Sequence, residues 1–274
     1  MTRLATTFDA LRARQRKALV VYLTAGDPDL ETSLEAAREA LAAGADVLEI
    51  GVPFSDPVAD GPVIQRAMGR AIQGGGGLSQ ALELVRRIRA ESDAPLVLFG
   101  YLNPWLWEGL EATCQRVKQA GADGALVVDL PHEESAEAHG LATASGLDWV
   151  RLVAPTSGTD RARRIAERAS GFLYAVSMTG VTGGQLTGVD GIRPMVTSMG
   201  EVTDTPVCVG FGVHDGPTAR AAAGIADGVV VGSAVVTALE AGAHDGSGPR
   251  RVGEKVAELR RGLDGEENTM GGLS

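Results

Sequence analysis

The chain has 274 residues, 44% of them hydrophobic and 22% charged, which is typical of a globular protein with a large core. Its formal charge of −10 and its lack of long basic runs argue against a nucleic-acid-binding protein. The longest apolar stretches are far shorter than the roughly 20 residues of a membrane span. The N-terminus has no apolar core like that of a signal peptide, and the two cysteines, Cys114 and Cys208, are expected to be core thiols. We therefore expect a cytoplasmic protein.

Buried strands and amphipathic helices alternate along the chain. An extra helix is expected over residues 3–16. Eight apolar runs predict strands buried on both faces: residues 19–23, 47–50, 96–99, 125–128, 149–153, 172–176, 207–209 and 228–231. Helical stretches lie between them, for example at residues 30–42, 78–90, 110–120, 159–169 and 218–223.

One short motif recurs where a helix gives way to a strand. It reads Ala43-Gly44-Ala45-Asp46, Ala120-Gly121-Ala122-Asp123 and Ala223-Gly224-Ile225-Ala226-Asp227, with a variant at Ser145-Gly146-Leu147-Asp148. The glycine is expected to end the helix in a left-handed conformation, and the apolar run that follows forms the next strand. A recurring α/β unit of this kind indicates a repetitive architecture.

Eight strands that alternate with helices favour a single (β/α)8 TIM barrel, with the extra N-terminal helix covering its floor. A doubly wound open sheet is the competing architecture. No change in composition marks a second domain, so we expect one domain over residues 1–263. Residues 264–274 are polar and rich in glycine, and we expect a disordered tail there.

Candidate acids cluster after the second strand. Active sites of barrels lie at the C-terminal ends of the strands, and Glu49 is an acid inside the buried run at that position. Burial raises the pKa of an unpaired carboxyl until it can donate a proton near neutral pH. Asp56 and Asp60 follow in a loop stiffened by prolines, and Asp60 could return to the same mouth as the second member of an acid/base pair. Structural duties remain open: backbone or arginine partners for Glu49, and helix capping before Gly61-Pro62 for the aspartates.

Glycines follow the sixth, seventh and eighth strands. They occur in Gly180-Val181-Thr182-Gly183-Gly184, in Gly210-Phe211-Gly212 and in Gly232-Ser233. The loops after the last strands of barrels commonly bind phosphate through backbone N–H groups, and glycines allow that backbone to come close. We therefore predict a phosphate site, with ordinary tight turns as the alternative.

The positions of lysine and histidine restrict the chemistry. None of Lys17, Lys118 and Lys255 falls at the C-terminal end of a strand, which argues against a Schiff-base mechanism. The four histidines are scattered without ligand spacing, so no metal site is expected. The residues together indicate a metal-free barrel that anchors a phosphate and uses carboxylates as acid and base.

A long motif identifies a family. Residues 48–65 read LEIGVPFSDPVADGPVIQ, which resembles the signature of the tryptophan synthase alpha subunit family nearly position for position. Supporting matches are YLTAGDP at residues 22–28, YLNP at 101–104, DLP at 129–131, GVTG at 180–183, GFG at 210–212 and VGS at 231–233. These matches extend over about residues 22–238. The run at 185–190, the insert-like segment at 242–250 and the C-terminal tail lie outside the match.

The resemblance implies a retro-aldol cleavage of indole-3-glycerol phosphate to indole and glyceraldehyde 3-phosphate, in L-tryptophan biosynthesis. Glu49 then moves protons to the indole carbon and from the glycerol hydroxyl, and Asp60 accepts or polarises the indole N–H proton. Thr182 matches a mobile loop residue that closes over the site. The remaining implied contacts are Gly183, Gly184, Gly212, Gly232 and Ser233 for the phosphate, and Tyr22, Phe99, Leu126 and Tyr174 for the indole.

The resemblance also implies a partner. The family forms an α2β2 complex in which indole passes to a beta chain that carries pyridoxal phosphate, so no cofactor is expected in this chain. The residues that resemble partner-facing positions are Asp56, Tyr101, Asn103 and Asp129.

Other interpretations of the function remain open. A stand-alone lyase would share every motif. Another phosphate-binding barrel would be expected to have a lysine at a strand end, which this chain lacks. A degenerate binding module would be expected to have lost one of the two acids, and this chain has both Glu49 and Asp60.

Overall fold

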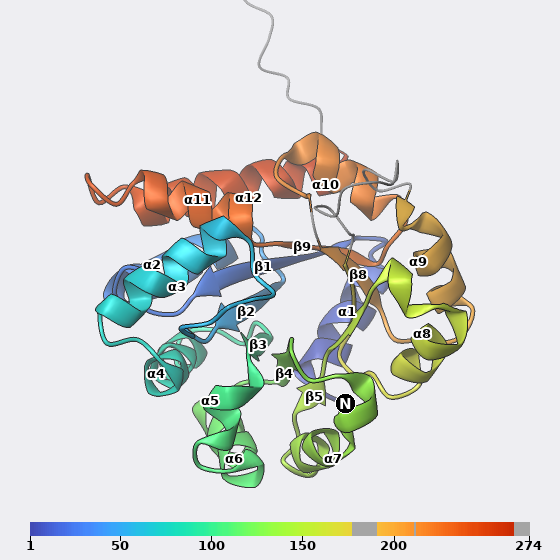
Figure 1. The fold of residues 1–274 in the computed structure, drawn as a ribbon. Coiled ribbons are helices and arrows are strands. Elements are labelled where there is room, and N and C mark those ends of the chain that lie inside the picture. The colour runs from blue at the N-terminus through green and yellow to red at the C-terminus, as the bar shows by residue number, and fades with distance from the viewer. Residues whose placement is uncertain (177–190, 211, 266–274) are drawn as a thin grey trace, which may run out of the picture.

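Parallel strands form the centre of the structure and helices surround them (Figure 1). The computed structural model describes residues 1–176, 191–210 and 212–265. Its strands are β1 (Ala18–Thr24), β2 (Val47–Gly51), β3 (Leu96–Gly100), β4 (Gly124–Val127), β5 (Asp148–Trp149), β6 (Arg151–Val153), β7 (Leu173–Val176), β8 (Val207–Gly210) and β9 (Gly228–Val231). Their order in the sheet is β5-β4-β3-β2-β1-β9-β8-β7-β6.

The sheet closes on itself at its fifth predicted strand. That strand is split into β5 and β6 by Val150, whose backbone N–H donates to Ala125 O of β4 at 2.9 Å. β5 pairs with β4, whereas β6 pairs with β7, so the chain changes neighbour at Val150. Since the two ends of the strand order are one residue apart in the chain, the nine strands make the eight-stranded barrel that the sequence predicts. The predicted (β/α)8 barrel is confirmed.

The helices cover the outside of the barrel, and one covers its floor. They are α1 (Arg3–Ala13), α2 (Leu30–Ala42), α3 (Pro62–Gln73), α4 (Leu78–Arg89), α5 (Leu102–Leu106), α6 (Leu110–Ala120), α7 (Ala136–Ala144), α8 (Thr159–Ala166), α9 (Arg193–Gly200), α10 (Gly216–Ala223), α11 (Ser233–Ala241) and α12 (Gly248–Asp264), with 3-10 turns η1 (His132–Glu134) and η2 (Pro155–Ser157). α1 is the predicted extra helix. Its Phe8 ring packs on Phe172, at the beginning of β7, with ring centroids 5.9 Å apart.

Two hydrophobic cores follow from the alternation of side chains along the strands. The outer core lies between the strands and the helices, and it includes Leu48 and Ile50 of β2. The inner core fills the barrel, and it includes Val47 of the same strand together with Tyr22 and Phe99. Since successive side chains of a strand point to opposite faces, Glu49 points into the barrel.

The recurring motif has a structural explanation at the floor of the barrel. The carboxylates of Asp46, Asp123 and Asp227 each accept a hydrogen bond from a backbone N–H in the first two residues of a neighbouring strand, at Leu19, Leu96 and Val207, over 2.8–2.9 Å. The glycine of the motif has the expected positive φ at Gly44, Gly121 and Gly146, but Gly224 has a φ of −66°. In these three units the motif therefore joins the strand that follows it to the strand that comes before it in the chain.

The C-terminal helix extends slightly further than the predicted domain. α12 includes Asp264, the first residue of the expected tail, and Gly265 ends the helix with a φ of +78°. The rest of that tail, residues 266–274, lies outside the described residues. Within the described part of the chain, no helix combines the length and the apolar character needed to cross a membrane.

Candidate active site

Glu49 is a buried acid at the centre of the barrel. Its register neighbours are Tyr22 on β1 and Val97 on β3, and its side chain is 1% exposed. Among the described residues its Oε1 has no hydrogen-bond partner. Burial raises the pKa of the Glu49 carboxyl to about 8, so the group is largely protonated at neutral pH. In a structural role, Glu49 would be paired with backbone donors or with an arginine. Among the described residues, its Oε1 has neither partner.

The raised pKa of Glu49 predicts how stability depends on pH. A carboxyl with a folded pKa of about 8 and an ordinary value of 4.5 binds more protons in the folded chain than in the unfolded chain between these values. The free energy of unfolding should therefore fall as pH rises from 4.5 to 8, by up to about 1.4 kcal/mol for each pH unit. Urea unfolding across this range should show a shallower fall for Glu49→Gln than for the parent. Equal slopes for the two proteins would contradict the assignment.

Asp60 lies in the loop between β2 and α3 and lines the same cavity as Glu49. Helix α3 is capped by Gly61 without a side-chain hydrogen bond, so neither aspartate of the loop caps it. Asp60 Oδ2 instead accepts a hydrogen bond of 2.6 Å from the Tyr101 hydroxyl, and its backbone O accepts one of 2.8 Å from Gln65 Nε2 on α3. Burial raises the pKa of Asp60, and the Tyr101 hydrogen bond opposes that rise.

Tyr101 differs from its predicted place on a partner-facing surface. Its side chain is 1% exposed, and its ring stacks on Phe54 with centroids 5.1 Å apart. Its hydroxyl oxygen accepts a hydrogen bond of 3.0 Å from Ala59 N while it donates to Asp60. A loop conformation that the sequence does not reveal thus folds Tyr101 inward onto the acid. The other predicted partner-facing residues, Asp56, Asn103 and Asp129, are exposed.

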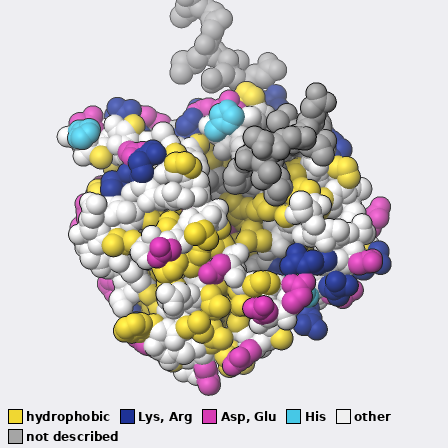
Figure 2. Space-filling model, in the orientation of Figure 1, with side chains coloured by type: hydrophobic (Ala, Val, Ile, Leu, Met, Phe, Trp, Pro, Cys, Tyr) yellow, Lys and Arg dark blue, Asp and Glu magenta, His cyan; other side chains and the backbone are white. Residues whose placement is uncertain are grey.

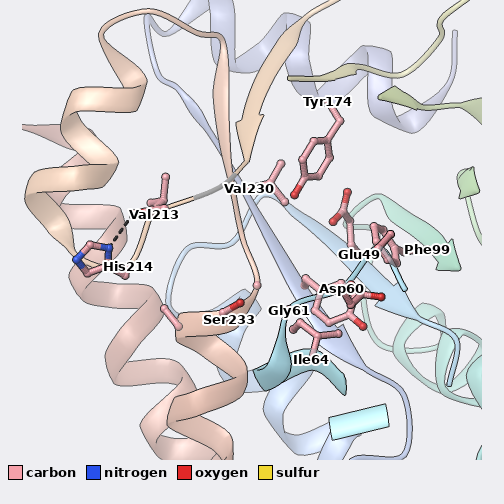
Figure 3. Close-up of a pocket in the computed structure, with 15 residues that line it drawn as sticks. Glu49, Asp60, Gly61, Ile64, Phe99, Tyr174, Val213, His214, Val230 and Ser233 are labelled. Atoms are coloured by element: carbon pink, nitrogen blue, oxygen red, sulfur yellow. Dashed lines mark hydrogen bonds between the residues drawn. The ribbon is translucent and has the colours of Figure 1, made fainter. Parts of the chain in front are cut away.

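The cavity opens at the C-terminal ends of the strands (Figure 3). Eight of the predicted site residues line it: Tyr22, Glu49, Asp60, Phe99, Tyr174, Gly212, Gly232 and Ser233. Leu126 lies in the same inner core but is not among the lining residues. The cavity is also lined by seven residues that no sequence pattern marked as site residues: Ala59, Gly61, Ile64, Val213, His214, Val230 and Ala234. Thr182, Gly183 and Gly184 lie outside the described residues.

Aromatic side chains form the wall next to Glu49 (Figure 3). The rings of Tyr22 and Phe99 meet edge to face with centroids 5.2 Å apart. Glycines at two strand ends make room for the tyrosine hydroxyls, since a Cβ on Gly51 would lie 2.1 Å from Tyr22 Oη, and one on Gly210 would lie 2.3 Å from Tyr174 Oη. The wall is therefore aromatic with a carboxyl beside it, which suits an aromatic ligand.

The other end of the cavity is built from the turns after β8 and β9. Gly232 and Ser233 lie at the beginning of α11, whose first N–H groups point out of the helix, and Gly212 has a φ of +75°. His214 holds its ring beside this turn through a contact of 2.7 Å between Nδ1 and Gly212 O. In the part of the chain that the structure describes, no lysine or arginine lines the cavity. A helix N-terminus with close-approaching glycines can bind an anion through its backbone.

The molecular surface around the cavity is mostly apolar. In Figure 2, hydrophobic side chains gather over the centre of the face and acidic side chains lie among them. Val58 and Trp107 are strongly exposed, at 84% and 90%. Large apolar side chains exposed on loops beside the mouth are a common feature of surfaces that bind another protein.

Comparisons with known families and proteins agree with this geometry. The family model described as tryptophan synthase alpha chain matches residues 8–264. The tryptophan synthase alpha chain of Desulfatibacillum aliphaticivorans is 48% identical over 240 residues, which cover 88% of this chain and 91% of the relative. That of Thioalkalivibrio sulfidiphilus is 44% identical over 266 residues, which cover 96% of this chain and the whole of the relative.

Solved structures show the same likeness. Tryptophan synthase subunit alpha from Legionella pneumophila superposes with a TM-score of 0.89 at 34% identity, and the match covers 97% of this chain and 99% of that chain. A chain of tryptophan synthase from M. tuberculosis, in an open form, superposes with a TM-score of 0.86 at 35% identity, covering 96% and 99% of the two chains. At these identities the chains resemble one another in sequence as well as in fold.

Proposed function

The chain belongs to the tryptophan synthase alpha chain family, and we propose that Glu49 and Asp60 carry its reaction. That reaction is the cleavage of indole-3-glycerol phosphate to indole and glyceraldehyde 3-phosphate, a lyase step of L-tryptophan biosynthesis. The observation that carries the proposal is the carboxyl of Glu49, which is buried without a partner for Oε1 among the described residues and points into the cavity that Asp60 also lines. Two carboxyls in different environments can act as acid and base in one turnover.

The first step moves two protons on the indole ring. Glu49, protonated near neutral pH because burial raises its pKa to about 8, gives its proton to the ring carbon that bears the side chain. Asp60, as the carboxylate that accepts the Tyr101 hydrogen bond, takes the ring N–H proton. The ring becomes a neutral indolenine, whose C=N bond can accept an electron pair.

The second step breaks the carbon–carbon bond. The Glu49 carboxylate left by the first step takes the proton of the adjacent glycerol hydroxyl, and that oxygen becomes the aldehyde of glyceraldehyde 3-phosphate. The electron pair of the broken bond restores the aromatic indole, and the ring nitrogen regains its proton from Asp60. Both acids return to their starting states, so neither a lysine nor a metal ion is needed to balance the steps.

The substrate spans the cavity in this proposal. Its indole lies against the aromatic wall of Tyr22, Phe99 and Tyr174, above Leu126, beside Glu49. Its phosphate lies on the opposite side, on Gly212, Gly232 and Ser233, together with Gly183 and Gly184 from the segment outside the described residues. The placement is supported by the arrangement in Figure 3, where Ser233 lies across from Glu49 and Tyr174. Thr182, outside the described residues, would belong to the loop that covers the substrate.

We further propose that the chain acts in the cytoplasm in an α2β2 complex with a tryptophan synthase beta chain. Pyridoxal phosphate then belongs to the beta chain. Support comes from the exposed positions of Asp56, Asn103 and Asp129 and from the neighbouring exposed Val58 and Trp107. A stand-alone lyase that releases indole without a partner is the second candidate, since it would use the same residues.

Indole release from indole-3-glycerol phosphate tests the proposal. The purified chain should release indole slowly, and the rate should rise sharply when a tryptophan synthase beta chain is added. Fast release that the beta chain does not change would favour the stand-alone lyase. No release in either case would overturn the proposed reaction.

Tyr101→Phe should disturb Asp60 without removing it. The change deletes the hydroxyl that donates to Asp60 Oδ2 and leaves the ring on Phe54. That hydrogen bond lowers the pKa of Asp60 against the effect of burial, so the pKa of Asp60 should rise further in Tyr101→Phe. The acid limb of the pH profile of kcat/KM should therefore shift to higher pH. An unshifted limb, with the folded state intact, would separate Tyr101 from Asp60 in the mechanism.

A further inference from the structure

A chain of ion pairs joins three segments that contribute to the cavity. Arg70 Nε and Nη2 donate to Oδ1 and Oδ2 of Asp27 at 2.7 and 2.9 Å. Arg70 Nη1 donates to Glu240 Oε1 at 2.6 Å, and Arg66 binds both oxygens of the same glutamate at 3.0–3.2 Å. We call Asp27, Arg66, Arg70 and Glu240 the Arg70 network. None of its members lines the cavity.

Each segment of the network continues into residues of the proposed site. Asp27 follows β1, the strand of Tyr22. Arg70 lies on α3, which begins directly after Asp60-Gly61 and holds the Asp60 backbone O through Gln65 Nε2 at 2.8 Å. Glu240 lies on α11, whose first residue is Ser233. The network thus connects the helix that positions Asp60 with the helix whose N-terminus faces the phosphate.

The chemistry of the pairs suits a positioning role. Asp27 is 1% exposed, and Arg70 holds both of its oxygens in the planar bidentate geometry that fixes direction as well as distance. An apolar contact between two helices tolerates small slides, whereas a guanidinium that binds both oxygens of Asp27 and one oxygen of Glu240 does not. Arg66 and Arg70 of α3 both bind Glu240 of α11, and Arg70 alone also binds Asp27, so these pairs set the position of α3 more narrowly than packing alone.

We propose that Arg70 is a positioning residue that sets the distance between Asp60 and the phosphate-binding end of the cavity. The proposal rests on the proposed function, because it takes indole and phosphate to bind at those two ends. It predicts that Arg70 matters for ligands that reach both ends at once and not for ligands that occupy the phosphate end alone. A role confined to stability predicts no such difference.

Binding of two unreactive ligands tests this proposal in the full chain. Indole-3-propanol phosphate carries an indole and a phosphate, whereas glycerol 3-phosphate carries only the phosphate part. In Arg70→Met, the Kd of the first should rise by at least about 10-fold, since a misplacement of the order of 1 Å weakens spanning interactions, while that of the second changes less than about 2-fold. Calorimetry measures both dissociation constants. The kcat of Arg70→Met should fall, as the Kd for indole-3-propanol phosphate rises.

The chain offers a matched control. Arg87 on α4 binds both oxygens of Glu31 on α2 at 2.6 and 2.8 Å, and its side chain is 30% exposed against 27% for Arg70. Arg87→Met removes a bidentate bridge of similar geometry, to an exposed glutamate, between helices that do not line the cavity, and both ligands should bind this variant as they bind the parent chain. If Arg70→Met does not fold, Glu240→Met, which removes both acceptor oxygens and leaves the Asp27–Arg70 pair intact, should give the same selective loss.

Three results would overturn the proposal. A folded Arg70 or Glu240 variant could bind both ligands with equally raised Kd values, or both with unchanged Kd values. Either outcome would show that the Arg70 network is only a structural bridge. A parent chain that binds glycerol 3-phosphate but not indole-3-propanol phosphate would remove the spanning ligand on which the argument depends. A parent chain that binds neither would refute the proposed function itself, and the positioning role with it.

Discussion

Glu49→Gln is expected to reduce indole release by at least about 10²-fold and by as much as about 10⁴-fold, the range found for one acid/base group. Glutamine has nearly the same shape, but it can neither give a proton to the indole carbon nor take one from the glycerol hydroxyl. Because the pKa of the buried carboxyl is raised to about 8, the substitution removes a group that is largely neutral at pH 7, and the fold should remain intact. Steady-state release of indole from indole-3-glycerol phosphate measures the effect.

Two controls accompany that measurement. Binding of glycerol 3-phosphate should be unchanged in Glu49→Gln, because the phosphate end of the cavity lies on other strands. Glu35→Gln on the exposed face of α2 should leave the rate unchanged. A rate loss in Glu49→Gln well short of about 10²-fold would remove Glu49 from the proton transfers.

Asp60→Asn should lower kcat by about 10²–10⁴-fold, with less effect on KM. The amide oxygen of asparagine can still accept the Tyr101 hydrogen bond, and the Gln65 bond goes to the backbone, so the loop keeps its anchors. The amide cannot accept the indole N–H proton, and the indolenine is then reached only with a positive charge on its nitrogen. An unchanged kcat would show that the ring proton leaves by another route.

Asp60→Glu provides the complementary variant. It restores a carboxylate but moves it by one methylene, so a partial recovery of the rate over Asp60→Asn would indicate that the base itself matters. A rate for Asp60→Glu equal to that of Asp60→Asn would instead assign the loss to geometry. Since the Tyr101 hydrogen bond of 2.6 Å is directional, we expect the recovery to be incomplete.

Local patterns in the sequence were sufficient to predict the barrel. The strand predicted at residues 19–23 is observed at Ala18–Thr24, and the helices predicted at residues 30–42 and 110–120 have those bounds in the structure. These elements bury continuous apolar runs or stripes, which fixes their period. The split of the fifth strand was not predictable, because Val150 interrupts no hydrophobic pattern and the change of partner occurs between distant segments.

The site was predictable where a single residue broke its local pattern. Glu49 is an acid in an apolar strand, and its inward direction follows from alternation. The hydrogen bond between Tyr101 and Asp60 was not predictable, because it joins residues 41 positions apart through a loop whose conformation no pattern fixes. The contacts of the Arg70 network could not be predicted from the sequence for the same reason, since Arg70 and Glu240 are 170 positions apart. Contacts between loops and helix ends require the three-dimensional structure.

The aspartates at the floor of the barrel reveal a line of weaker attachment in the wall. Asp46, Asp123 and Asp227 each fasten a neighbouring strand, but Asp148, at the equivalent point of the fourth motif, has a buried Oδ2 without a hydrogen-bond partner among the described residues. Asp148 begins β5, the two-residue strand beside the interruption at Val150. β5 is instead held by its pairing with β4 and by Ser170 Oγ, which accepts a hydrogen bond of 2.8 Å from Trp149 N, so fewer carboxylate contacts fasten this part of the wall. On heating, local opening of the sheet should begin at β5 and β6. These strands lie on the side of the barrel away from β1 and β2, the most extensively paired strands.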